Sequence, residues 1–229
     1  MFDRLPRWSL YGAVILAFSA GCVNSTTLVG FTHLSASHVT GNVTLFANAI
    51  VAGDWAFLGF VCLTLLAFLL GSVISGYVVG GRSFRVGRRY EIALVIEVVL
   101  LCMAFLLLYR GLFWGQLFAA MACGLQNAMV TTYSGAIIRT THLTGLTSDM
   151  GSAIGNFLAG RGIKKSVVLF QAALWYGFCG GGVMGAVLFV RVGYLGLLLP
   201  IIIISMMAVF YRVGLTKLGK KYTRPKKDN

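Results

Sequence analysis

The chain has 229 residues, of which 58% are hydrophobic and only 11% are charged, and its formal net charge is +13. Soluble domains carry about 25% charged residues, so this composition excludes an ordinary soluble domain and indicates an integral membrane protein in contact with the lipid bilayer. The positive charge lies in short runs beside apolar segments, where it orients membrane helices, and nucleic acid is therefore not an expected partner.

Eight apolar segments follow one another along the chain. Six of them are long enough to cross the hydrocarbon core of a bilayer, about 30 Å thick, as α-helices. These six are residues 9–31, 55–81, 90–110, 112–134, 166–190 and 194–212. The other two are residues 40–53, which would reach only about 21 Å as a helix, and 144–160, which contains several polar residues. We expect both to be re-entrant or broken half-helices.

The placement of basic residues favours six crossings over eight. With the two short segments re-entrant and the N-terminus inside, the basic residues of 82–89, of 139–165 and of the C-terminal tail are cytoplasmic, and Arg110 and Arg191 lie outside. If all eight segments cross, the arginines of 82–89 move outside. The positive-inside rule therefore predicts six spans with both termini in the cytoplasm. Eight spans with parallel repeats is the alternative.

Short motifs of the first half recur in the same order in the second half. GCVN at 21–24 corresponds to GLQN at 124–127, HVTG at 38–41 to HLTG at 142–145, Gly71 and Gly76 to Gly180 and Gly185, and Tyr109-Arg110 to Tyr211-Arg212. This order indicates a duplication, with repeats at 1–110 and 111–214 and a basic cytoplasmic tail at 215–229. Three spans per repeat require opposite orientations, so the predicted fold is all-α with two inverted-topology repeats. Transporters of this kind hold their site near the membrane midplane.

The repeated HxTG motif stands at the start of each predicted half-helix. Thr40 and Thr144 are expected to be N-caps, and the free N–H groups and positive dipole end of a helix suit an anion or a carboxylate. Glycine in the first turn lets a backbone or ligand come close, and histidine can donate, accept or titrate. The candidate substrate-binding residues here are His38, Thr40, Gly41, Asn42, His142, Thr144 and Gly145. Alternatively, these polar groups only satisfy the backbone of broken helices.

The GxxN motif places Asn24 and Asn127 inside two predicted spans, with Gln126 beside the second. If these helices adjoin the half-helices, the three carboxamides would line the same cavity and contact the substrate. The alternative is that they form hydrogen bonds between helices.

Two acidic residues, Glu97 and Asp149, lie within apolar segments. A charge at the centre of a membrane is costly, so each must be paired, hydrated or protonated. Both are candidates for carrying a coupling proton or binding a cation. For Glu97 the alternative is a position near the cytoplasmic interface beside Arg88 and Arg89.

Enzyme signatures are missing from the sequence. There is no HExxH, GxSxG or phosphate-loop motif, and the five cysteines lack the spacing of metal ligands or redox pairs. We therefore expect no catalytic residue, no metal site and no cofactor.

Four longer motifs carry a family resemblance. They are AGCVN (20–24), SHVTGN (37–42), CGLQNAM (123–129) and THLTG (141–145), and their order and spacing hold over most of the chain from about 11 to 212. With these motifs the chain resembles a YoaK-like family of bacterial multi-pass inner-membrane proteins, a domain of unknown function. The resemblance implies the bacterial inner membrane and implies no particular activity.

Together these patterns predict a small inverted-repeat transporter or channel for a small polar or anionic solute or ion. So short a chain is also expected to work as a homodimer. A membrane-embedded enzyme or cofactor protein that uses the two histidines is the second hypothesis. The third is a non-catalytic membrane assembly subunit, in which the polar motifs would be buried without a cavity.

Overall fold

The computed structural model describes residues 7–80, 89–134 and 141–222. Within these ranges every regular element is a helix, which confirms the predicted all-α class. In chain order the elements are α1 (Arg7–Val29), α2 (Val39–Ala52), α3 (Trp55–Val79), α4 (Tyr90–Tyr109), α5 (Trp114–Ser134), α6 (Leu143–Leu158), α7 (Lys165–Val192), the 3-10 helix η2 (Gly193–Leu197) and α8 (Leu198–Tyr222).

Several of these helices are long and apolar enough to cross a membrane. They fall in Leu10–Val29, Trp55–Val79, Tyr90–Tyr109 and Lys165–Gly214, and the last stretch contains both α7 and α8. Helix α5 is less apolar because it carries two glutamines and an asparagine. Large apolar side chains such as Leu66 and Val99 are more than half exposed. Such surfaces are compatible with a membrane protein, in which lipid covers them.

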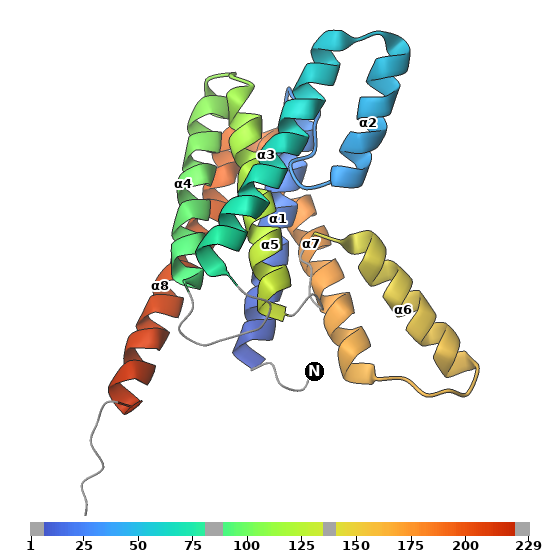
Figure 1. The fold of residues 1–229 in the computed structure, drawn as a ribbon, viewed down its shortest axis with the longest axis vertical. Coiled ribbons are helices and arrows are strands. Elements are labelled where there is room, and N and C mark those ends of the chain that lie inside the picture. Colours follow the sequence, from blue (N-terminus) through green and yellow to red (C-terminus); the bar gives the residue numbers. More distant parts are fainter. Residues whose placement is uncertain (1–6, 81–88, 135–140, 223–229) are drawn as a thin grey trace, which may run out of the picture.

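The two short helices differ from the rest in where they begin. Figure 1 shows α2 starting at about half the height of the bundle and running towards one end, and α6 starting at a similar height and running towards the other end. A tight turn at Gly53, in a left-handed conformation, joins α2 to α3. Both short helices coincide with the two segments whose length and polarity set them apart in the sequence.

The tightest packing joins α1 to α7. Gly21 of α1 lies against the backbone carbonyl of Phe178, and Gly181 of α7 lies against the backbone carbonyl of Phe18. A Cβ atom at either glycine would overlap the facing oxygen. Glycine therefore lets the two backbones approach to a distance that no larger residue allows.

The same arrangement joins α3 to α5. Here Gly71 lies against the carbonyl of Met121, and Gly124 lies against the carbonyl of Phe68. In both helix pairs, therefore, each of the two helices has one glycine that lies against the backbone of its partner.

The glycine correspondences drawn from the sequence need correction. The residue of α7 that makes the contact equivalent to that of Gly71 is Gly181, next to the expected Gly180, whose Cβ would meet only the Phe18 ring at 3.9 Å. Gly76 of α3 has open space around it. A shift of one residue turns a helical side chain by about 100°, so it decides which glycine faces the neighbouring helix.

Candidate functional site

Each short helix begins directly after a histidine. The N-cap residues are His38, with φ −88° and ψ 71°, and His142, with φ −95° and ψ 61°, and neither side chain makes a capping hydrogen bond. Thr40 and Thr144 are the second residues of their helices, so the prediction that they are N-caps is wrong. Each helix begins one residue before its threonine. The residue that precedes the histidine, Ser37 or Thr141, is hydrogen-bonded to a neighbouring long helix.

The start of α2 is anchored to α1 through Asn24. Its side-chain oxygen accepts hydrogen bonds from the backbone N–H of Ser37 at 3.0 Å and the hydroxyl of Ser37 at 2.8 Å, and also from the hydroxyl of Ser35. The backbone N–H of His38 in turn donates to the Ser35 hydroxyl at 3.0 Å. The residue before the histidine is therefore fixed to a long helix.

The start of α6 is anchored to α5 in the same way. The side-chain oxygen of Asn127 accepts a hydrogen bond from the Thr141 hydroxyl at 3.0 Å, and Thr141 directly precedes His142. For both asparagines the amide nitrogen has no partner in the described part of the chain. The side-chain carbonyl of each asparagine thus holds the start of a short helix in place. Its NH₂ group makes no hydrogen bond to the described residues.

The glycine of each HxTG motif makes room for the histidine of the same motif. A Cβ atom at Gly41 would collide with the His38 ring, and one at Gly145 would collide with the His142 ring, with Nδ1 the nearest atom in both cases. The imidazole therefore folds back over the first turn of its helix. The space that each glycine leaves is filled by the histidine of its own motif, and a close approach of a ligand to these glycines stays a prediction.

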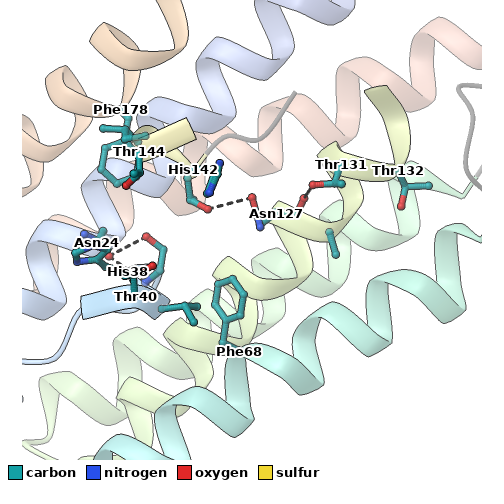
Figure 2. A pocket seen from close by; sticks show the side chains of 15 residues that line it. Asn24, His38, Thr40, Phe68, Asn127, Thr131, Thr132, His142, Thr144 and Phe178 are labelled. Carbon is teal, nitrogen blue, oxygen red and sulfur yellow. Dashed lines mark hydrogen bonds between the residues drawn. The ribbon is translucent and has the colours of Figure 1, made fainter. Parts of the chain in front are cut away.

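These elements surround one cavity of about 640 Å³. Figure 2 shows the histidines, threonines and asparagines of the two motifs facing it from different helices. Residues from α1, α2, α3, α5, α6 and α7 line it: Asn24, Ser37, His38, Val39, Thr40, Phe68, Asn127, Ala128, Thr131, Thr132, Thr141, His142, Leu143, Thr144 and Phe178. Six candidates from the sequence are among them, three from each half: Asn24, His38, Thr40, Asn127, His142 and Thr144.

The comparison with known proteins shows the family of this chain. Residues 12–210 match DUF1275, a protein of unknown function. The chain belongs to this family. The match runs from α1 into α8 and so includes every element of the cavity. No curated protein and no solved structure matches the chain. The narrower resemblance to YoaK stays a prediction.

Four other candidates of this DUF1275 member do not line the cavity. Gly41 and Gly145 lie under the histidine rings. Asn42 is buried and its amide donates to the Ser35 carbonyl at 2.8 Å. Gln126 is 1% exposed and its amide donates to the Leu16 carbonyl of α1 at 2.9 Å. Gln126 thus has the helix-to-helix role that was the alternative for this motif.

Several cavity residues were missed in the sequence. Thr131 and Thr132 follow Asn127 by about one helical turn, and Phe68 and Phe178 occupy comparable places in α3 and α7. Ser37 and Thr141 directly precede the histidines, and this shared position of a hydroxyl residue was the one available signal.

The two acidic candidates lie apart from the cavity lining. Asp149 is exposed on α6, and its carboxylate lies 3.4 Å from the side-chain amide of Gln171 on α7. Glu97 is 1% exposed and lies two turns inside α4. The alternative that places it near the cytoplasmic interface stays a prediction. Arg88, the basic neighbour expected there, lies outside the described residues.

The free polar groups of the cavity are mainly hydrogen-bond donors. Among the described residues that line it there is no Asp, Glu, Lys or Arg. The first-turn N–H groups of Thr40, Gly41, Thr144 and Gly145 find no acceptor within residues 7–80, 89–134 and 141–222. The N–H groups of Thr40 and Thr144, which line the cavity, and the two asparagine NH₂ groups form a donor-rich lining, and no fixed charge lies among the described lining residues. In the same described ranges, no three His, Cys, Asp or Glu side chains come together as a metal site.

Proposed function

We propose that this protein is a membrane transporter for a small anionic or strongly polar solute, which binds in the cavity between the two half-helices. The observation that carries the proposal is that the first turns of α2 and α6 line the same cavity. Helix N-termini present unpaired N–H groups and the positive end of the helix dipole, which favour negative charge. In a membrane, broken helices are typical of transporter sites near the midplane.

The chemistry of the lining supports an anion in preference to a cation. The carbonyl oxygens of Asn24 and Asn127, which could coordinate a cation, already accept hydrogen bonds from Ser37 and Thr141. Their amide nitrogens, the first-turn N–H groups and the Thr40 and Thr144 hydroxyls are available as donors. Hydrogen bonds to an ionised acceptor are stronger than those between neutral groups, so such a site binds anionic solutes better than neutral ones.

The topology that fits these observations is two inverted repeats of three spans and one half-helix. Figure 1 supports it, because α1 and α5 run in opposite directions, as do α2 and α6, and α3 and α7. The glycine contacts between α1 and α7 are matched by those between α3 and α5. We place both chain ends in the cytoplasm of a bacterium, with Lys164 and Lys165 on the same side and Arg110 and Arg191 on the other, as the positive-inside rule favours.

Site-directed labelling tests this orientation. A cysteine at Ala52, in the exposed end of α2, is expected to react with an impermeant maleimide added outside intact cells. A cysteine at Lys164, before α7, is expected to react only after the membrane is opened. The measurement is gel shift in a background lacking the native cysteines. Equal accessibility of both positions from one side would contradict the inverted arrangement.

The helix packing favours a transporter over a channel. The pairs α1–α7 and α3–α5 each have extensive contacts, whereas α1 and α5, which belong to different pairs, have few residues close to one another. The cavity lies between these two tightly packed pairs. Rigid-body rocking of one unit against another is the usual basis of alternating access, and this division of contacts permits it.

Each half-helix connects the two pairs. Helix α2 packs on α3, yet its start is hydrogen-bonded to Asn24 of α1. Helix α6 packs on α7, yet its start is hydrogen-bonded to Asn127 of α5. Relative movement of the pairs would therefore tilt both half-helices and redirect their N–H groups. In this mechanism the solute site and the moving parts are the same residues.

The threonine hydroxyls provide the test of binding. We expect Thr40→Val and Thr144→Val each to weaken anion binding by roughly ten- to a hundredfold, because one hydrogen bond to a charged group is worth about 1.5–3 kcal/mol. The measurement is the ligand-induced rise in melting temperature of the purified protein with sodium nitrate, sulfate, phosphate and succinate.

Two threonines outside the cavity serve as matched controls. Thr44 and Thr147 lie one turn further along α2 and α6, and their hydroxyls donate to the carbonyls of Thr40 and Leu143 at 3.1 and 2.9 Å. Thr44→Val and Thr147→Val should leave the anion-induced shift unchanged. If all four variants lose it equally, or if no anion stabilises the wild type, the proposed site is wrong.

A further inference from the structure

A buried carboxyl group lies outside the cavity lining and is not part of the proposed solute site. Glu97 of α4 is 1% exposed, and its Oε2 atom has no hydrogen-bond partner among the described residues. Buried polar atoms are almost always hydrogen-bonded, and an unpaired buried charge is strongly disfavoured. In this conformation the side chain is therefore held as a neutral, protonated acid.

Within the part of the chain that the structure describes, the surroundings of Glu97 offer no positive charge to balance an ionised carboxylate. Helix α4 packs on α3, α5, η2 and α8. From α5, Cys123 is buried and lies close enough to interact electrostatically with Glu97. The fully buried residues of α3, η2 and α8 include no ionisable side chain. The partly buried Tyr211 of α8 packs its ring on Tyr90, two turns from Glu97 along α4.

Glu97 is nevertheless near the cavity. Its neighbour Cys123 is the tenth residue of the 21-residue α5, near the middle of the helix. Asn127 follows Cys123 by four positions, so both lie on the same face of α5 and about 6 Å apart along its axis. Asn127 lines the cavity and holds the start of α6. A movement of α5 that redirects α6 would therefore also change the environment of Glu97.

We propose that Glu97 is a proton-binding site that couples proton movement to solute movement. In the conformation described here the proton is bound and the acid is dry. A conformation that admits water to the α4–α5 interface would let the carboxyl group ionise and release the proton, because hydration removes most of the cost of the charge. Each anion would then cross together with a proton. The coupling of the proton to an anion rests on the proposed transport function. The protonation of Glu97 rests on its burial alone.

The protonated state can be tested without a solute. Dicyclohexylcarbodiimide reacts with protonated carboxyl groups in apolar surroundings, and we expect mass spectrometry of the full-length protein to show an adduct at Glu97. Labelling should fall as the pH is raised. Glu97→Gln should abolish this adduct, whereas Glu91→Gln, near the start of the same helix, should keep it. Absence of the adduct at every pH would overturn the assignment.

The coupling is tested in liposomes that contain a pH-sensitive dye. An inward gradient of nitrate, sulfate, phosphate or succinate should acidify the lumen when wild-type protein is present. With Glu97→Gln, acidification should fall to the rate of empty liposomes while exchange of the same labelled anion across the membrane continues. Unchanged acidification with Glu97→Gln would overturn the proposal. Failure of anion exchange by the wild type would instead contradict the proposed function, and the labelling result would still decide the proton site.

Discussion

Gly181→Ala is expected to cause a large loss of folded protein. A Cβ atom at this position would overlap the backbone carbonyl of Phe18. Overpacking in a core typically costs about 1–3 kcal/mol, and here the cost is at the upper end or beyond, because a backbone group cannot move aside as a side chain can. Yield of monodisperse protein and its melting temperature in detergent measure the effect.

The neighbouring glycine is the control. Gly180→Ala places its Cβ at an ordinary 3.9 Å from the Phe18 ring and should leave yield and melting temperature near those of the wild type. In the other pair, Gly71→Ala should behave like Gly181→Ala, and Gly76→Ala, in open space, should behave like Gly180→Ala. Similar behaviour of all four variants would show that these helices do not cross as described.

Gly41→Ala and Gly145→Ala are expected to weaken anion binding without unfolding the protein, because each displaces a histidine ring that lines the cavity. The added methyl group would take the place of the His38 or His142 ring and turn it away from the first turn. Alanine is favoured over glycine in a helix by about 1 kcal/mol, so the helix itself gains stability. Anion-induced thermal shift and transport should therefore fall while the melting temperature of the free protein is kept or raised.

Two glycines further along α6 provide matched controls, because alanine there should raise helix stability without affecting anion binding. Gly151 and Gly155 have nothing within 4 Å of an added Cβ, so Gly151→Ala and Gly155→Ala gain the same helix propensity without moving a histidine. They should keep anion binding. Loss of binding in these variants too would mean that stiffening α6, and not displacement of the ring, is responsible.

Much of the candidate site could be predicted because its residues are conspicuous in an apolar chain. Histidine, asparagine and threonine are costly in a membrane unless they have partners or a role, so their recurrence as HxTG and GxxN drew attention to them. The structure brings His38 and His142 to one cavity. The recurrence of the same motif at the start of two short segments is the feature of the sequence that led us to expect this. Whether a solute binds there stays a prediction.

What could not be predicted depends on rotation about a helix axis. Gln126 and Asn127 are adjacent in sequence and equally polar, yet Asn127 lines the cavity and Gln126 bonds to α1. The choice is made by the glycine contact at Gly124, which fixes how α5 is turned against α3. The sequence shows the glycines without showing which of them faces a neighbour, and the same ambiguity separates Gly180 from Gly181.

The prediction that the threonines are caps failed for a different reason. Thr40 is a good capping residue by propensity, but the boundary of α2 is set by long-range hydrogen bonds from Ser37 to Asn24 in another helix. Local preference cannot anticipate a partner 13 positions away in the chain. Glu97 likewise gave no sign of its burial, since Glu91 on the same helix is only partly buried.

Phe68 and Phe178, whose side chains line the cavity, also take part in the packing of the helix pairs. The carbonyl group of Phe178 is the one that Gly21 touches, and the carbonyl group of Phe68 is the one that Gly124 touches. The width of the chamber is thus set at the same points where the backbones are in closest contact. Under the proposed function, variants that accept bulkier solutes should therefore be sought among substitutions flanking these crossings, outside the residues that line the cavity.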